Sequence, residues 1–279
     1  MAFFIQVANG RRINITWISG LLFLIPCEFT RSTYYSAGIT KAEIELAQDF
    51  LSEHKMGDQA YNTRLFRVET PSGPVLKIYV ACAEAKESVA HTFRGKSIEM
   101  CYGDHQPFMK CLAESIDKAS KHVPAERIDQ AKMCEKYVKA FKGGNINDHK
   151  DSQRAWVKDK GPPVETNIGF IESYRDPFGV RGEFEGFVAV VNREQSRKFQ
   201  DLVDKATEFI AMLPWPSEFE KDSFLRPDFT SLDVVSFASS GIPAGINIPN
   251  YDDIRYRDAR LPKSNLQYRA PQAPVAPKC

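Results

Sequence analysis

The clearest pattern along the chain is a recurrence of apolar residues at helical spacing over residues 196–213. One broad face of the helix predicted there carries Phe199, Leu202, Val203, Ala206, Phe209, Ile210 and Leu213. Pro214 and Pro216 end this helix, because proline cannot continue the backbone hydrogen bonding. A face this wide must be buried against another part of a protein if it is to stay out of water.

A second helix is predicted over residues 40–53. It begins with a Thr-x-x-Glu capping box formed by Thr40 and Glu43, after which apolar residues recur at helical spacing. A short helix is also predicted to end near Trp156.

Two longer helices are predicted between these. The first has Pro107 in its opening turn, where proline is well tolerated. The second runs over residues 124–142 to a left-handed stop at Gly143-Gly144. The apolar stripe of the first helix is Phe108, Leu112, Ile116 and Ala119. The stripe of the second is Ile128, Ala131, Cys134, Val138 and Phe141, widened by Met133 and Tyr137.

Runs rich in β-branched and aromatic residues predict strands among these helices. The strands cover residues 64–67, 75–82, 167–174, 184–191, 232–237 and 241–248. Pro177 and Gly179 break the chain between the third and fourth strands, whereas residues 83–99 give no clear pattern. The predicted fold class is α+β, in which the last four strands form one sheet packed against the helices of residues 40–142.

Ionisable and aromatic side chains are unusually dense over residues 171–191. If the chain is extended there, alternate side chains share a face, so Glu172 and Tyr174 point the same way. A carboxylate can bind an amine, and a phenol can donate a hydrogen bond. On the pattern alone, a surface acid beside a half-buried sheet tyrosine is the more common outcome.

Composition and charge exclude some classes of function. The chain has 279 residues, of which 43% are hydrophobic and 26% charged, as in soluble globular proteins. A net charge of +1 gives no general attraction to nucleic acid or to anionic lipid. Six cysteines without C-x-x-C spacing favour reduced thiols and a cytoplasmic location.

Both ends of the chain differ in character from the rest. Residues 13–27 are apolar and follow Arg11-Arg12, which is the layout of a secretory signal, but no cleavage site is evident. The run is also shorter than the ~20 residues that a spanning helix needs, so no membrane association is expected. A signal peptide over residues 1–31 is therefore only the minority alternative. Residues 256–279, rich in Arg and Pro, are expected to be disordered.

No complete catalytic motif occurs in the sequence. There is no G-x-S-x-G elbow, no phosphate loop, and no H-E-x-x-H zinc motif among the five histidines, which are His54, His91, His105, His122 and His149. Each of these histidines is expected to be a surface or structural residue. A catalytic Cys/His pair stays open, although nothing marks one thiol as activated.

Several long blocks of the sequence resemble the dipeptidyl peptidase III family. The blocks include TYYSAGITKAEIELAQDFL, AYNTRLFR, KDKGPPVE, IESYRDPFGVRGEFEGFVAVV, PWPSEFEKDSFLRPDFTSLDVVSF and SSGIPAGINIPNYDDIR. They run in order from residue 33 to residue 255. The family comprises two-lobed zinc metallopeptidases that remove dipeptides from the N-terminus of short peptides.

This resemblance implies a division of the chain into parts. Because it begins near residue 33, it implies that residues 1–31 are a divergent leader. It makes residues 32–192 the substrate-docking lobe, a mixture of helices with a β-barrel-like sheet. It makes residues 193–230 a helical fragment of the second, metal-bearing lobe, and residues 231–255 a return to the sheet of the first lobe.

The resemblance also implies roles for individual residues. Tyr174 would hydrogen-bond at the scissile carbonyl, Glu172 would receive the ammonium of the substrate, and Glu185 would lie near the same end. Asn247 and Asn250 would bind the peptide backbone. The remaining substrate-binding positions are Gly241, Pro243 and Ala244, whose small size keeps the sheet edge open to a ligand. Without the resemblance, Asn247 and Asn250 would be interpreted as turn residues around a proline.

Zinc is implied by the family, but no zinc is expected to be bound by this chain. The family motif His-Glu-x-x-x-His, with its later Glu-Glu-x-x-x-Glu stretch, does not occur in the sequence. We therefore expect a truncated family member that binds short peptides weakly and does not hydrolyse them. The alternative is a non-catalytic remnant, or a mis-spliced or frameshifted product with no function of its own. In either case the apolar face of residues 196–213 is expected to be uncovered and to cause self-association.

Overall fold

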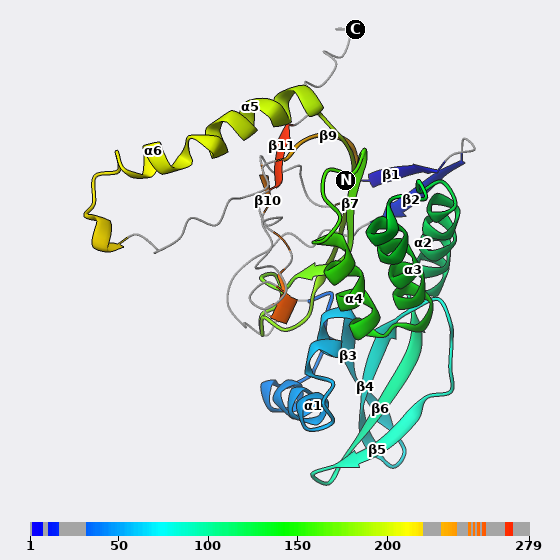
Figure 1. Cartoon of the computed structure of the whole chain (residues 1–279). Helices are drawn as coiled ribbons and strands as arrows, with labels where there is room; N and C mark the ends of the chain where they lie inside the picture. The colour runs from blue at the N-terminus through cyan, green and yellow to red at the C-terminus, as the bar shows by residue number, and fades with distance from the viewer. Residues whose placement is uncertain are drawn as a thin grey trace, which may run out of the picture. The chain divides into compact units, whose positions relative to one another are not determined.

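The chain forms two compact units, which are described separately. The computed structural model (Figure 1) describes residues 2–7, 11–16, 32–219, 230–238, 245–246, 248, 250–251, 253–254 and 266–269. The first unit comprises Met1–Ala125, Ala131–Ser152 and Gly169–Glu185. The second comprises Glu126–Gln130, Gln153–Ile168 and Gly186–Cys279.

A four-stranded sheet is the centre of the first unit. Its strands are β3 (Thr63–Thr70), β4 (Gly73–Ala81), β5 (Val89–Phe93) and β6 (Lys96–Asp104), in the order β3-β4-β6-β5. β4 pairs antiparallel with β3 and parallel with β6, which in turn pairs antiparallel with β5. The two strands predicted over residues 64–67 and 75–82 are confirmed. Residues 83–99, which gave no pattern, contain β5 and the start of β6.

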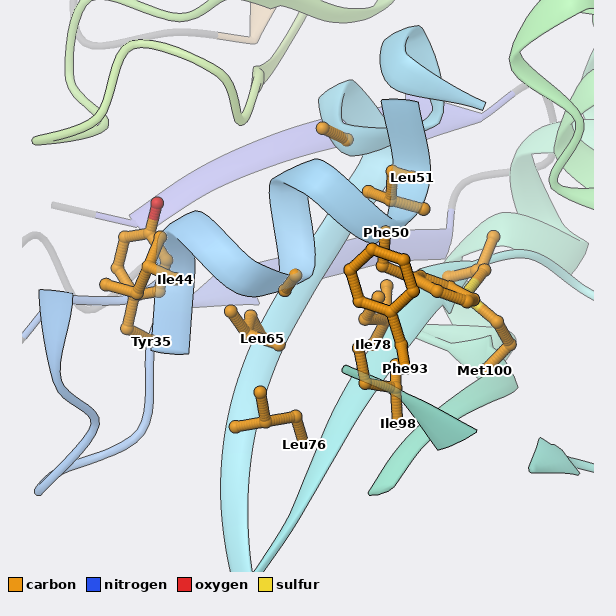
Figure 2. Packing of buried hydrophobic residues seen from close by; sticks show 13 residues of the cluster. Tyr35, Ile44, Phe50, Leu51, Leu65, Leu76, Ile78, Phe93, Ile98 and Met100 are labelled. Atoms are coloured by element: carbon orange, nitrogen blue, oxygen red, sulfur yellow. The ribbon is translucent and has the colours of Figure 1, made fainter. Parts of the chain in front are cut away.

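Helix α1 (Lys41–Glu53) covers this sheet and closes the core. The predicted capping box is present, because the Thr40 hydroxyl accepts from the Glu43 amide while the Glu43 carboxylate accepts from the Thr40 amide. Figure 2 shows Phe50 of the helix among buried side chains of the strands, including Ile78 and Ile98. This helix therefore packs on the sheet of residues 63–104. The prediction that it packs on the sheet containing residues 171–191 is wrong.

Helix α2 (Gln106–Ser120) of the first unit turns a different face inward from the one predicted. Its buried residues are Met109, Ala113 and Ile116, whereas Phe108 is 45% exposed. The 3.6-residue period fixes the spacing of a stripe but not which of two overlapping stripes meets the sheet. Phe108 lies in the first turn beside Pro107, so it falls outside the contact.

In α3 (Ile128–Gly143) most of the predicted stripe is buried. Its first residue, Ile128, is 74% exposed, because the helix begins there and not at residue 124. The buried residues are Gln130, Met133, Cys134, Tyr137, Ala140 and Phe141. The predicted stop is confirmed: Gly144 has a φ of +76°, and its carbonyl accepts from the side chains of Gln59 and Asn62. Helix α4 (Ile146–Trp156) follows and ends where predicted.

The predicted strands of residues 167–248 do lie in one sheet. It contains β7 (Val164–Glu172), β8 (Glu183–Val191), β9 (Thr230–Ala238), β10 (Gly245–Ile246) and β11 (Leu266–Arg269), in the order β10-β11-β9-β8-β7. β8 and β9 are antiparallel, whereas β9 and β11 are parallel. The fold is α+β, but the described residues form open sheets and no closed barrel, so the barrel-like description is not confirmed.

The helix predicted over residues 196–213 is interrupted. It begins earlier, as α5 (Arg193–Asp204), because the Asn192 side chain caps it by accepting from the Gln195 amide at 3.0 Å. A short α6 (Ala206–Ile210) and the 3-10 turn η2 (Ser217–Phe219) follow. Of the predicted apolar face only Val203 is buried, while Leu202 is 48% and Phe209 43% exposed. This face is therefore largely uncovered, as predicted for this chain.

The two ends of the chain are described only in part. β1 (Ala2–Val7) and β2 (Arg11–Thr16) pair antiparallel within the predicted leader, and residues 17–31 lie outside the described residues. Most of residues 256–279 also lie outside them, but β11 is a strand where disorder was predicted. No described helix has the length and apolar character needed to cross a membrane. The divisions at residues 192, 230 and 255 stay predictions.

Candidate functional site

The candidate site lies at one end of the β7–β8 pair, within the first unit. β7 ends at Glu172 and β8 begins at Glu183, so residues 173–182 form the loop that joins them. Tyr174 lies on this loop and is 68% exposed, whereas Glu172 and Glu185 are half-buried at the strand ends. The predicted extended alternation from Glu172 to Tyr174 is wrong, because the strand stops two residues before the tyrosine.

Three carboxylates nevertheless act electrostatically on the phenol of Tyr174. Partial burial raises the pKa of its phenol, and the negative charges of Glu185, Glu172 and Glu183 raise that pKa further. The phenol is therefore protonated at neutral pH and can donate a hydrogen bond. The same group of carboxylates makes the surroundings negative, which suits a ligand with an ammonium group.

Glu183 belongs to this group, although sequence analysis did not identify it. Its carboxylate accepts from the Arg175 guanidinium at 2.6 Å and is only 13% exposed. Arg175 therefore offsets part of the negative charge that Glu183 contributes to the site. The sequence held a signal: Glu183 and Glu185 are two residues apart in a strand, so they share a face.

The other predicted substrate-binding positions belong to the second unit. Gly241, Pro243, Ala244 and Asn247 lie outside the described residues. Asn250 is half-buried between Ile248 and Tyr251, both of which are buried. β10 is an edge strand of its sheet, as the prediction of a ligand-accessible edge requires. The roles of Asn247 and Asn250 in holding a peptide stay predictions.

Comparison with known proteins places the chain in a family. Residues 19–259 match the model of Peptidase family M49. The chain belongs to this family. The match starts earlier than residue 33, where the resemblance was first evident, and includes the whole candidate site.

Relatives in the M49 family share high identity with the chain. It is 51% identical to dipeptidyl peptidase 3 of Dictyostelium discoideum over 90% of its own length and 37% of the relative. It is 48% identical to dipeptidyl peptidase 3 of Homo sapiens, over 80% of the chain and 31% of the relative. The chain therefore spans about a third of the length of these curated relatives.

Solved structures support the fold. The structure of DPP III from Caldithrix abyssi matches the chain with a TM-score of 0.58 at 20% identity. The match covers 85% of this chain and 40% of that structure. That of dipeptidyl-peptidase III from Corallococcus sp. strain EGB gives a TM-score of 0.54 at 19% identity, over 85% of the chain and 39% of that structure. The mixed arrangement of helices and open sheets is thus the arrangement of part of an M49 protein.

The described residues of this M49 chain do not fit a zinc site. A protein zinc site takes three or four His, Cys, Asp or Glu ligands in tetrahedral geometry. In the part of the chain that the structure describes, no three such side chains come together in a way that could hold a metal ion. His149, which is buried, instead packs against the stacked rings of Tyr137 and Phe141, and burial lowers its pKa to about 4.

Proposed function

We propose that this chain is the peptide-docking part of a zinc dipeptidyl peptidase of the M49 family. Glu172 and Glu185 bind the ammonium at the N-terminus of a short peptide, and Tyr174 donates a hydrogen bond to a peptide carbonyl. The observation that carries the proposal is that Glu172, Glu183 and Glu185, at the adjacent ends of β7 and β8, all act electrostatically on the protonated Tyr174 phenol.

The chemistry of these side chains fits an exopeptidase better than an endopeptidase. A free N-terminus carries a positive charge, whereas an internal peptide bond does not, so a negative site selects chain ends. Tyr174 is exposed enough to reach a ligand, and its hydrogen bond strengthens as negative charge develops on a carbonyl oxygen.

The proposal limits the chain alone to binding. The family motif for zinc is absent from the 279 residues, and the described residues do not fit the metal. Tyr174 and the two glutamates orient a peptide but supply no nucleophile. We therefore propose weak peptide binding without hydrolysis for this chain, in a cytoplasmic setting consistent with free Cys82, Cys101, Cys111 and Cys134.

One observation favours the second candidate, a product without a function of its own. The apolar face of α5 and α6 is largely uncovered, and such a surface favours aggregation over a specific activity. Under this alternative the chain associates with itself before it binds any peptide.

Peptide binding tests the main proposal. A tripeptide amide with a free N-terminus is titrated into the 279-residue chain by NMR, alongside the same peptide with an acetylated N-terminus. We expect only the free amine to bind, and Glu172→Gln to weaken its affinity roughly 10- to 100-fold, because a charge-assisted hydrogen bond is lost. Glu114→Gln, on the exposed face of α2, is the matched control and should leave affinity unchanged.

The proposal that the chain alone does not hydrolyse peptides is tested with a dipeptidyl-arylamide and added zinc. We expect no release of arylamine and no zinc retained after dialysis. Equal binding of the free and acetylated peptides would disprove recognition of the ammonium. Stoichiometric zinc, together with turnover that Tyr174→Phe abolishes, would disprove the proposal that the chain binds peptides without hydrolysing them.

A further inference from the structure

The loop that carries Tyr174 is folded around one buried carboxylate. Asp176 is 4% exposed, and its two oxygens accept from the backbone amides of Phe178, Val180 and Arg181 at 3.2, 3.0 and 2.8 Å. A fourth donor is the Tyr35 hydroxyl, at 2.7 Å. Three converging amides form an anion-binding turn, so the charge of Asp176 holds residues 176–181 in one conformation.

Arg181 supplies the opposite charge from within the same core. It is fully buried, and its Nη1 donates to the Tyr35 hydroxyl at 3.0 Å. Its guanidinium carbon also lies 4.9 Å from the centre of the Tyr35 ring, a cation–π distance. Among the described residues, Nε and Nη2 of this arginine have no hydrogen-bond partner. The Tyr35 hydroxyl therefore joins a buried acid to a buried base, as donor to one and acceptor from the other.

Tyr35 itself is fixed to the four-stranded sheet. It forms a parallel β-bridge with Leu65 of β3. The Ser36 amide donates to the Leu65 carbonyl at 3.2 Å, and the Leu65 amide donates to the Tyr34 carbonyl at 2.9 Å. The Tyr35 ring also packs edge-on against Phe178 of the loop at 5.8 Å. The side chain of Tyr35 thus connects the four-stranded sheet to the loop that carries Tyr174.

The far end of the loop is held separately. The Gly182 amide donates to the Tyr61 carbonyl at 2.8 Å, and a side chain at Gly182 would lie 2.9 Å from the Phe170 backbone. Glu172 immediately precedes the loop, and Tyr174 lies two residues before Asp176. Because residues 176–182 are fixed, the position of Tyr174 can vary only through the backbone conformation of residues 173–175.

We propose that Tyr35, Asp176 and Arg181 form a buried positioning network that sets the orientation of Tyr174 beside Glu172 for binding a peptide N-terminus. None of the three touches the ligand; they act through the loop. The proposal rests on the proposed peptide-docking function and adds the residues that preorganise it.

The test compares Tyr35→Phe with Tyr79→Phe in the 279-residue chain. Both remove one hydroxyl from a tyrosine of the first unit, but the Tyr79 ring packs on Phe66 and lies outside the network. Three quantities are measured: hydrogen exchange of the Val180 and Arg181 amides, the 19F resonance of 3-fluorotyrosine placed at position 174, and affinity for the free-amine tripeptide amide.

In Tyr35→Phe we expect exchange of both amides to rise about tenfold, the resonance at position 174 to shift without any peptide, and affinity to fall roughly 3- to 10-fold, as for a lost internal hydrogen bond. Tyr79→Phe should leave all three unchanged. Asp176→Asn, which removes the charge while keeping the size of the side chain, should change all three in the same direction and further.

Two results would overturn the network. Unchanged exchange in Tyr35→Phe would show that the hydroxyl does not hold the loop. Faster exchange with an unchanged resonance and affinity would show that the network stabilises the fold without positioning Tyr174. If the wild-type chain binds no free-amine peptide, the proposed function fails, and the exchange and the 19F resonance still decide whether the network orients Tyr174.

Discussion

Two properties of Tyr174 come from different parts of its surroundings. Its exposure follows from its place on the loop beyond the end of β7, while its raised pKa follows first from partial burial and then from the charges of Glu185 and Glu172 on the strands. A tyrosine within the strand would be less accessible, and one on a loop without acids would lack the contribution of these charges. The short distance in sequence between strand end and loop therefore gives an accessible donor in a negative environment.

His149 predicts a dependence of stability on pH. Burial lowers its pKa to about 4, against 6.5 for the ordinary group, so the unfolded chain binds a proton more readily than the folded chain. Its contribution to stability is present above pH 6.5 and is lost as pH falls towards 4. We expect the free energy of unfolding to be about 2–3 kcal/mol lower at pH 4.5 than at pH 7.5 from this residue.

The measurement is urea unfolding at the two pH values for the wild type and for His149→Gln. Other groups also titrate in this range, so the difference between the two proteins isolates the histidine. An equal pH dependence in both would contradict the prediction.

Gly169 predicts a second effect at the residue scale, which concerns the same histidine. A Cβ at this position would lie 2.3 Å from Cε1 of His149, whose ring is enclosed by Tyr137 and Phe141. We expect Gly169→Ala to destabilise the chain by about 1–3 kcal/mol through overpacking. Gly57→Ala is the control, since its Cβ would meet only the Ser52 hydroxyl, at 3.7 Å. A urea midpoint for Gly169→Ala equal to that of the control would refute this explanation.

At the scale of elements, the start of α1 was predictable because its signals are local. Thr40 and Glu43 are three residues apart, and both hydrogen bonds of the capping box form. We expect Thr40→Ala to lower the free energy of unfolding by about 1 kcal/mol, and Thr40→Ser to retain most of this stabilisation because it keeps the hydroxyl. Chemical denaturation of the three proteins checks this. Serine behaving like alanine would mean that the hydroxyl does not contribute.

Other features of the elements were not predictable, because they depend on contacts between distant residues. The strand pair β3–β4 followed from its turn, but the buried stripe of α2 depends on the surface that this helix meets. The resemblance supplied Glu172, Tyr174 and Glu185 as site residues. It did not supply Asp176 and Arg181, whose bonds to Tyr35 join residues 141 and 146 positions apart. Sequence patterns of short range carry no information on such pairs.

At the scale of the whole molecule, the uncovered face of α5 and α6 predicts self-association. Leu202 and Phe209 are each more than two-fifths exposed, and Met212, just beyond α6, is 77% exposed. Apolar side chains gathered in this way lose contact with water when two molecules meet, at roughly 25 cal/mol for each Å² buried. We expect concentration-dependent oligomers in light scattering and binding of a hydrophobic dye. The double variant Leu202→Lys and Met212→Lys should reduce both.

The control for this last prediction is Val235→Lys on β9. Val235 is 69% exposed on a strand, so the substitution places one lysine on exposed apolar surface outside α5 and α6, against two lysines in the double variant. If association is driven by the face of α5 and α6, the control remains as oligomeric as the wild type, whereas the double variant is monomeric. A wild-type chain that is monomeric at all concentrations and binds no dye would show that this face is tolerated in water. The second candidate function would then lose the observation that favours it.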